Sequence, residues 1–291
     1  MEAAIHTLRS YVALTKPRIL LLVIFTGLPV MGMAAGGFPP LGATLAVLLG
    51  IALAAAAANA LNCYIERDRD ALMERTRTRP LPAQELSPQA ALAFGLALSV
   101  ISTALLLLVA TPLAAGLGVA SILFYVFIYT VWLKPRTPMN AVVGGAAGAV
   151  APLIADAALH GQITAAGWIL FAIIFLWQPP HVWAIALFRR DDYERAGIPM
   201  LPAVLGEQAT RWRMLWYTLA LIPVTLAPTA LGLLGIPYLC AALALDAWFT
   251  WHIVRVLRER DDDAARRAFH VSLAYLFALF LAMLVDIALG A

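Results

Sequence analysis

Apolar residues run through this chain in nine long stretches that are separated by short polar connections. A membrane-spanning helix needs roughly 17–25 mostly apolar residues, and each stretch approaches or meets that length. The pattern therefore predicts an all-α integral membrane protein, with one transmembrane domain over residues 1–291. The nine predicted spans are 19–36, 41–61, 90–110, 112–133, 141–159, 164–188, 214–234, 237–254 and 269–289.

Composition supports a membrane protein and excludes an ordinary soluble domain. The chain is 63% hydrophobic and 13% charged, and its mean hydropathy is +0.85. Soluble domains are about 45–50% apolar and about 25% charged. The lipid bilayer is therefore expected to be the solvent for most of the surface.

The basic residues predict how the chain crosses the membrane. All twenty Lys and Arg lie in alternate connections, within residues 9–18, 67–79, 134–136, 189–213 and 255–267. Positive residues concentrate on the cytoplasmic side of membrane proteins. An odd number of spans, with a cytoplasmic N-terminus and the C-terminus on the outer side of the cell inner membrane, satisfies this rule. The basic face favours contact with anionic headgroups or substrates, and not with nucleic acid.

Polar residues appear abruptly where the second apolar stretch ends. Asn62, Glu66 and Asp70 follow one another at intervals of four residues, and Asn59 precedes them. On a continuing helix the three side chains share one face, about 6 Å apart along the axis. Their oxygen atoms suit Mg²⁺, which proteins commonly use to hold a diphosphate. The alternative is a solvated loop, with Asn59 bonded to a neighbouring helix.

Two groups of cations follow on the same side of the membrane. Arg75 and Arg79 are four residues apart, and their guanidinium groups suit phosphate oxygens. Lys134 and Arg136 lie in a short connection after the fourth span. They either extend this diphosphate site or act only as determinants of topology.

A second acidic cluster follows the sixth span. Asp191 and Asp192 are adjacent, so on a helix at most one of them meets a given metal ion directly. The two longest polar connections, about 64–88 and 189–213, are expected to face a shared cavity. The alternative is a surface loop whose acids are neutralised by the nearby arginines.

Residues 177–183, Trp-Gln-Pro-Pro-His-Val-Trp, interrupt the sixth span. Two prolines in a transmembrane helix are tolerated where the helix lines a cavity or is buried in protein. His181 is therefore a candidate for haem ligation or proton transfer, and Trp177 offers a flat apolar wall. The alternative is a histidine bonded to a neighbouring helix.

Other polar residues in the spans carry no assignment from sequence. Cys63 and Cys240 are predicted on opposite sides of the membrane without a CxxC motif, which indicates neither a disulfide nor a thiolate metal site. For Asp156, Asp246 and Asp286 a structural role and a proton-linked role both remain open.

These motifs together resemble the UbiA-type intramembrane prenyltransferases. The first motif of that family, Asn-xxx-Asp-xxx-Asp, is present as Asn62-xxx-Glu66-xxx-Asp70, and its second acidic motif is present only as Asp191-Asp192. Three strings are similar to the haem-farnesylating branch of the family. They are Arg75-Thr-x-x-Arg79-Pro-Leu81, Trp177-Gln-Pro-Pro-His181 and Asp192-Tyr-x-x-x-Gly-Ile-Pro-Met-Leu-Pro202.

The resemblance implies a fold, a reaction and a set of site residues. The fold is nine transmembrane helices around a central cavity. The reaction is transfer of a farnesyl group from farnesyl diphosphate to the 2-vinyl group of haem B, with addition of water, to give haem O. The rivals are prenylation of an aromatic quinone precursor and a carrier without chemistry. A downstream haem A synthase is a possible partner by analogy.

The residue patterns and the resemblance together assign roles to the candidate residues, and the resemblance implies that Asn59, Arg75, Arg79 and His181 are essential. The roles are as follows: Asn59, Asn62, Glu66, Asp70 and His181 in catalysis; Arg75, Arg79, Lys134 and Arg136 on the diphosphate; His181 and Trp177 on haem; and Asn62, Glu66, Asp70, Asp191 and Asp192 on Mg²⁺.

Overall fold

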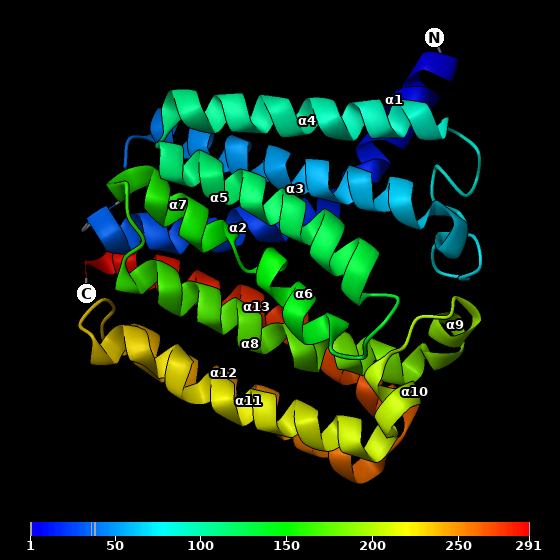
Figure 1. Ribbon diagram of the computed structural model, residues 1–291. Coiled ribbons are helices and arrows are strands. Elements are labelled where there is room, and N and C mark those ends of the chain that lie inside the picture. The colour runs from blue at the N-terminus through cyan, green and yellow to red at the C-terminus, as the bar shows by residue number, and fades with distance from the viewer. Residues whose placement is uncertain (1, 36, 38, 291) are drawn as a thin grey trace.

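A computed structural model describes residues 2–35, 37 and 39–290, and every regular element in them is a helix (Figure 1). The helices are α1 Glu2–Leu14, α2 Pro17–Ala35, α3 Leu41–Asp70, α4 Pro88–Val109, α5 Pro112–Leu123, the π-helix η1 Phe124–Leu133, α6 Asn140–Gly148, α7 Ala151–His160, α8 Ala165–Phe188, α9 Arg190–Arg195, α10 Leu201–Leu205, α11 Glu207–Ala230, α12 Ile236–Glu259 and α13 Asp262–Leu289.

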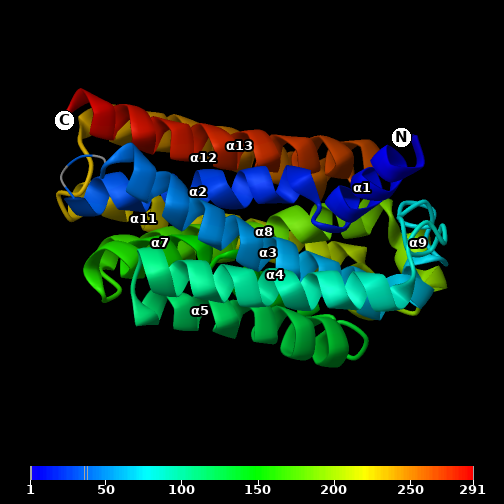
Figure 2. The ribbon, with the colours of Figure 1, turned by 90° about the horizontal axis from the view of Figure 1, so that it is seen from above.

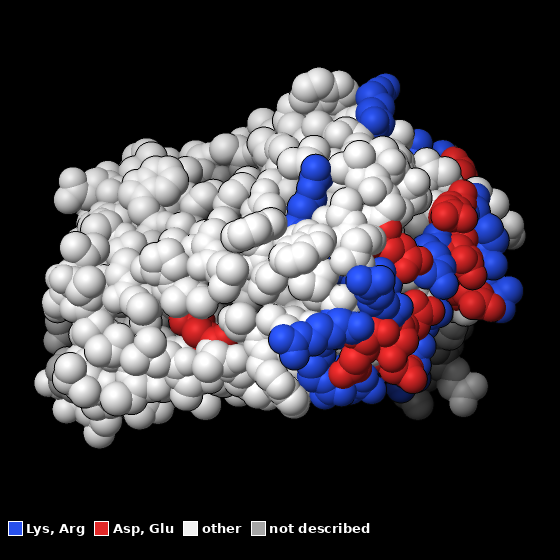
Figure 3. Space-filling view, turned by 90° about the horizontal axis from the view of Figure 1, so that it is seen from below, with Lys and Arg blue, Asp and Glu red and all other residues white. Residues whose placement is uncertain are grey.

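The long helices lie side by side along one direction, with the two chain ends at opposite ends of the bundle (Figures 1 and 2). Charged side chains gather at the end that carries α9 and α10, and most of the remaining visible surface is uncharged (Figure 3). Large apolar side chains such as Leu21, Val100 and Leu108 are exposed on the sides of the bundle. The protein is therefore a multi-pass membrane protein whose charges are concentrated at one end.

Length and composition identify fewer spans in the described residues than the predicted nine. Seven helical segments of the described residues are long and apolar enough to cross a membrane, and the pair α1–α2, bent by 49°, raises the number to eight. The remaining helix, α11, corresponds to the predicted span 214–234 but does not pass the same test. Its sequence includes Pro223, Pro228 and several Thr and Trp residues, which lower its mean hydropathy. Even so, α11 packs between α8 and α12 in the bundle.

Two predicted spans have internal features that the apolar pattern did not show. The fourth continues from α5 into the π-helix η1, in which backbone N–H groups bond five residues back, as Lys134 N does to Tyr129 O at 2.9 Å. The fifth is divided between α6 and α7 at Ala149 and Val150, just before Pro152. By contrast, α8 continues through Pro179 and Pro180.

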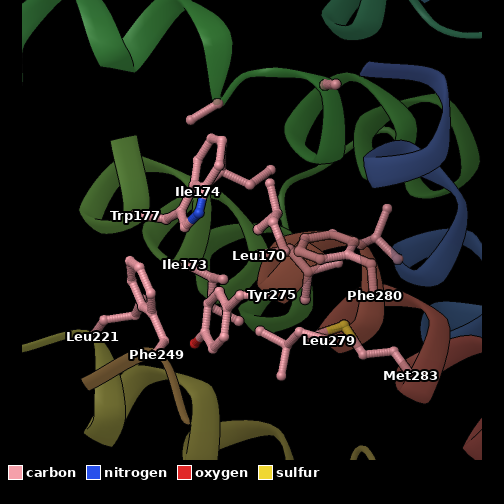
Figure 4. Close-up of a cluster of buried hydrophobic side chains, with 14 of the residues drawn as sticks. Leu170, Ile173, Ile174, Trp177, Leu221, Phe249, Tyr275, Leu279, Phe280 and Met283 are labelled. Atoms are coloured by element: carbon pink, nitrogen blue, oxygen red, sulfur yellow. The ribbon is translucent and has the colours of Figure 1, made fainter. Parts of the chain in front are cut away.

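The part of the main apolar core drawn in Figure 4 lies between α8, α11, α12 and α13. Leu170 and Ile173 of α8 and Leu279 of α13 are fully buried in it. Phe249 of α12 stacks on Tyr275 of α13, with ring centroids 4.7 Å apart. This core fixes the position of α8 relative to α13, and these two helices carry one wall of the cavity described below.

The three buried acids of the spans are bonded within the fold. Asp156 accepts hydrogen bonds from the backbone N–H of Thr164, at 2.6 Å, and from its hydroxyl group, at the beginning of α8. Asp286 accepts from the N–H groups of Gly235, at 2.7 Å, and Tyr238, at 3.0 Å, at the beginning of α12. Both therefore cap helix N-termini from a different helix.

Asp246 occupies the interior of the bundle. It accepts hydrogen bonds from Tyr275 Oη and Thr225 Oγ1, each at 2.6 Å. Every carboxylate oxygen of this side chain is thus satisfied, as burial requires. These contacts favour a structural role for all three acids over a proton-linked one.

Loss of the Asp286 cap is expected to destabilise the protein. Asp286→Ala leaves the buried N–H group of Tyr238 and the partly buried one of Gly235 without this partner, at a cost of about 3 kcal/mol. Asp261 is an exposed residue whose side chain accepts a hydrogen bond from Ala264 N at the start of α13. Asp261→Ala is expected to cost about 1 kcal/mol of stability. Thermal unfolding of the two purified variants in detergent measures the difference. Equal shifts of the unfolding midpoint would contradict the capping role of Asp286.

Candidate active site

A cavity of about 560 Å³ lies near the charged end of the bundle, where Asp70, Arg75 and Arg79 line it. Its walls come from α2, α3, η1, α6, α8, α9 and α13, together with residues that precede α2 or follow α3, η1 and α9. Polar side chains line the part near the end of α3, whereas Ile174, Leu276 and other apolar residues line the part between α8 and α13. A single cavity therefore joins a charged region to an apolar one.

Asn62, Glu66 and Asp70, which were predicted to share one face at the end of the second span, lie in this cavity and are called the polar ladder below. Helix α3 continues nine residues beyond the predicted end of that span, to Asp70, so the four-residue spacing does place three side chains on one face. Asn62, Glu66 and Asp70 are buried and line the cavity. Asn62 Nδ2 donates to Glu66 Oε2 at 2.9 Å and to Thr130 Oγ1 at 3.1 Å. Thr130 belongs to η1, so this helix helps to hold the Asn62 side chain in place.

Each acid of the ladder is paired with a cation from another segment. Lys134 Nζ lies 2.5 and 2.6 Å from the two carboxylate oxygens of Glu66. Arg79 Nη1 donates to Asp70 Oδ2 at 2.7 Å. Burial opposes the charge of Lys134, but the neighbouring oxygens of Tyr129 and Glu66 raise its pKa above the ordinary value. Burial also opposes the charge of Arg79, and Asp70 raises the pKa of that guanidinium. Both side chains are therefore cationic at neutral pH.

Lys16 is a further cation of the cavity that the sequence did not indicate. Its Nζ donates to Asn62 Oδ1 at 2.8 Å. The residue lies at the bend between α1 and α2 with a φ of 54°, an uncommon left-handed conformation for a lysine. Asn59 Nδ2 donates to the carbonyl of Thr15 at 3.0 Å and so fixes this bend. The Lys16-Pro17-Arg18 string before the first span was the available signal.

Asn59 itself lines a second, smaller cavity of about 110 Å³. Residues of α2, α3, α6 and α7, among them three alanines of α3, form most of its walls. Ile19, Val23, Tyr125 and Gly148 line both cavities, so the two spaces adjoin. The structure thus places Asn59 beside the ladder and next to the α1–α2 bend.

The π-helix directs aromatic side chains towards the ladder. Tyr125 and Tyr129, with ring centroids 5.2 Å apart, both line the main cavity. Helix α6 approaches them closely, since a Cβ atom at Gly144 would overlap the Tyr129 ring. A π-helix frequently occurs at functional sites, and here it brings both rings and Lys134 to one wall.

The remaining predicted cations occupy different positions. Arg75 lines the cavity, although its side chain is largely exposed. Arg136 is exposed and lies outside the lining residues; its guanidinium donates to the carbonyls of Val131, at 2.9 Å, and Trp132, at 3.0 Å. The structure therefore brings Arg75 into the site and leaves Arg136 out, because backbone carbonyls at the end of η1 hold the Arg136 side chain.

The two acids of the second cluster point in different directions, as expected for adjacent residues on a helix. The Asp191 side chain is 84% exposed and lies outside the cavity. Asp192 is buried, accepts a hydrogen bond from Glu74 N at 3.2 Å and is paired with Arg195. Burial would raise the pKa of Asp192, but the Arg195 and Glu74 hydrogen bonds hold it below the ordinary value. Asp192 therefore ties the second polar connection to the first.

His181 forms part of the apolar wall. Its ring is stacked between Trp177 and Phe269, at centroid distances of 4.5 and 4.7 Å. Its Nδ1 lies 2.7 Å from Ser272 Oγ. Trp177 Nε1 donates to the carbonyl of Ser272 at 2.8 Å. Sequence reasoning missed Ser272 and Phe269, because nothing local in the last span marks them as neighbours of α8.

The donor set at the end of α3 fits a magnesium ion. The described residues contain no group of three or more His, Cys, Asp or Glu side chains placed to hold a metal ion. Mg²⁺, however, commonly takes only one or two carboxylates from the protein and completes its shell with water and substrate phosphates. Glu66, Asp70 and the amide oxygen of Asn62, all lining the cavity, supply such a set.

The chain is similar in sequence to curated bacterial proteins over nearly its whole length. It is 50% identical to a protein of Symbiobacterium thermophilum named protoheme IX farnesyltransferase, covering 97% of this chain and 95% of the relative. It is 49% identical to a protein of the same name from Acidiphilium cryptum, covering 96% and 91% of the two chains.

The fold is similar to that of solved membrane proteins. A structure described as digeranylgeranylglyceryl phosphate synthase in membranes superposes with a TM-score of 0.81 and 18% identity, covering 99% of both chains. A UbiA homologue from Archaeoglobus fulgidus bound to DMAPP and Mg²⁺ superposes with a TM-score of 0.64 and 15% identity, covering 95% of this chain and 99% of the homologue. The model of the UbiA prenyltransferase family matches residues 20–284. The chain therefore belongs to the UbiA prenyltransferase family.

Proposed function

We propose that this protein transfers the farnesyl group of farnesyl diphosphate to the 2-vinyl group of haem B, with addition of water, and releases haem O and diphosphate. Relatives at 45–50% identity over most of the chain carry the name protoheme IX farnesyltransferase. The observation that carries the proposal is the shared cavity. It joins a polar ladder with cations to a wall formed by His181 and aromatic rings.

The diphosphate is assigned to the charged part of the cavity. Lys16, Arg75, Arg79 and Lys134 all line it, and their donors suit phosphate oxygens. Asn62, Glu66 and Asp70 would hold Mg²⁺, which supplies electrostatic stabilisation of the leaving diphosphate. Fixed positive charge at the leaving group is the main source of catalysis when a C–O bond ionises.

The reaction begins with heterolysis of the bond between farnesyl C1 and the diphosphate oxygen, which keeps the electron pair. The terminal carbon of the 2-vinyl group supplies its π electrons to C1 and forms the new C–C bond. The positive charge then rests on the vinyl carbon next to the porphyrin ring. A water oxygen adds to that carbon and releases one proton. The apolar wall, with Ile174 and Leu276, keeps water from the first cation.

The haem is assigned to the part of the cavity beside α8 and α13. Trp177, His181 and Phe269 all line it. Their stacked rings form one rigid apolar surface, and the ring edges that line the cavity are available to pack against an apolar macrocycle. This placement brings the haem next to the charged part of the cavity, where farnesyl C1 would lie.

The orientation in the membrane is proposed from the positions of the charges. All twenty Lys and Arg lie in alternate connections, which favours nine crossings, a cytoplasmic N-terminus and an outer C-terminus in the cell inner membrane. Helix α11 would then be the ninth crossing, buried partly against α8 and α12. Haem O released into the membrane would be available to a downstream haem A synthase.

A specific observation disfavours each rival function. An aromatic quinone precursor needs no histidine, whereas His181 lines the cavity between two aromatic rings. A carrier without chemistry needs neither the carboxylate ladder nor the cations paired with it.

Purified protein in detergent is expected to convert haem B when supplied with farnesyl diphosphate and Mg²⁺. Mass spectrometry should detect a haem that has gained one farnesyl group and one hydroxyl group. A chelator should abolish the product, and added Mg²⁺ should restore it. Bound but unchanged haem would indicate a carrier, and prenylation of an aromatic acid instead of haem would indicate the quinone-precursor reaction.

Asp70→Asn should lower turnover at least about a hundredfold, because it removes a negative charge from the proposed metal site. Haem binding, followed by its absorption spectrum, should persist. Asp68→Asn is the matched control, since the Asp68 side chain is 86% exposed and only two residues away. Retained activity in the Asp70 variant would remove the metal assignment.

Arg79→Lys should raise the KM for farnesyl diphosphate about tenfold or more, because lysine cannot form the paired hydrogen bonds of a guanidinium. Arg136→Lys serves as the control, since Arg136 lies outside the cavity and is bonded to backbone carbonyls. Initial rates at varied concentrations of farnesyl diphosphate give the KM of each variant. The assignment fails if the two substitutions raise KM equally.

A further inference from the structure

We propose that Ser272 is a positioning residue that fixes the tautomer of His181, so that Nε2 presents a lone pair to the iron of the haem substrate. The proposal rests on the proposed function for the identity of the substrate. The tautomer itself follows from the hydrogen bonds of the protein alone, and these can be tested without any substrate.

The proton positions follow from two short contacts of one hydroxyl group. Ser272 Oγ lies 2.7 Å from the carbonyl oxygen of Phe269 and 2.7 Å from His181 Nδ1. A hydroxyl group has a single proton, and a carbonyl oxygen can only accept. The proposal places the Ser272 proton towards Phe269, since otherwise two oxygen atoms would approach without a proton between them. The contact with His181 then requires that Nδ1 donates.

A neutral imidazole that carries its proton on Nδ1 has a free lone pair on Nε2. The second nitrogen of a metal-binding histidine commonly bonds to a partner that fixes the tautomer and the ring orientation. Ser272 matches that description. It is 1% exposed and is not among the residues that line the cavity, so its hydroxyl group acts on a bound haem only through His181.

The ring of His181 has little freedom to turn away from this arrangement. Trp177 covers one face, at an interplanar angle of 19°, and Phe269 covers the other, at 23°. Ser272 occupies the Nδ1 edge. Within the described part of the chain, Nε2 has no hydrogen-bond partner and is not among the buried atoms without a partner. His181 lines the cavity, so the remaining accessible edge of the ring faces it.

Ser272 also holds the neighbouring wall. Its backbone carbonyl accepts from Trp177 Nε1 at 2.8 Å, while its hydroxyl group bonds to His181. One residue of α13 thus sets both side chains of α8. Substitution of its side chain removes the contact with His181 and leaves the backbone contact with Trp177 in place, which allows the two effects to be separated.

The first experiment measures the tautomer in the haem-free protein. Protein labelled with ¹⁵N-histidine is studied in detergent at neutral pH by NMR, and the His181 signals are assigned by their loss in His181→Ala. The wild type is expected to be protonated at Nδ1 and bare at Nε2. Ser272→Ala should shift the population to the Nε2–H form, and Ser272→Thr should restore the wild-type form. A proton on Nε2 in the wild type would overturn the proposal.

The second experiment measures ligation, with ferric haem titrated into each variant and followed by its Soret band. Ser272→Ala is expected to weaken haem binding about 10–100-fold and to alter the spectrum in the same sense as His181→Ala. Ser102→Ala is the matched control, because Ser102 is also 1% exposed and bonds only to the Gly50 carbonyl, at 2.8 Å. A wild-type spectrum in His181→Ala would overturn iron ligation.

The two measurements separate this proposal from the proposed function. Farnesyl transfer is scored by product mass, whereas the tautomer is scored without substrate and ligation without farnesyl diphosphate. A protein that shows the Nδ1–H tautomer and histidine-ligated haem but makes no farnesylated product would retain the role of Ser272 and refute only the reaction.

Discussion

A charge buried beside lipid must have a partner inside the protein, and this constraint shapes the end of the bundle that holds the cavity. An isolated charge in a low-dielectric interior is far less stable than the same charge in water. Glu66 and Asp70 meet the constraint through Lys134 and Arg79. The paired side chains come from different connections, so the same contacts that satisfy the charges also draw those connections around one space.

This arrangement also suits the proposed chemistry. Phosphate oxygens compete with carboxylates for Lys and Arg, and a divalent cation competes with those same Lys and Arg for the carboxylates. A diphosphate with Mg²⁺ can therefore enter by exchange of partners and leaves no charge unpaired. Lys16 is the exception, since it is held on the amide oxygen of Asn62 and not on a carboxylate. The charges of Glu66 and Asp70 are already compensated, so this part of the site is preorganised.

Residues that support the site do so through backbone and hydroxyl groups. Asp192 accepts from the backbone N–H of Glu74, which connects the segments that follow α8 and α3. Asn59 donates to the Thr15 carbonyl and holds the bend from which Lys16 extends. Asp156 and Asp286 satisfy the helix N-termini of α8 and α12 at the other end of the bundle. A polar side chain inside an apolar span looks functional in a sequence. Here most such side chains form hydrogen bonds to backbone groups, which lipid cannot do.

The local pattern determined what depends on local geometry. Runs of apolar residues predicted the helices and the membrane environment, and the four-residue spacing predicted that Asn62, Glu66 and Asp70 share one face, because helix periodicity is the same wherever a helix forms. The apolar pattern determined the number of crossings less firmly, because α11 is less apolar than the other long helices and packs against α8 and α12.

Tertiary structure decided which polar side chains reach the site. Arg136 and Lys134 are two residues apart, yet only Lys134 enters the cavity, because the end of η1 directs them differently. Ser272 meets His181 across 91 positions of sequence, and Asp192 meets Glu74 across 118. Such contacts arise from the packing of distant helices and connections, which no periodicity along the chain records. The sequence by itself thus determined the helices and the shared polar face at the end of α3, and only packing decided which partners complete the cavity.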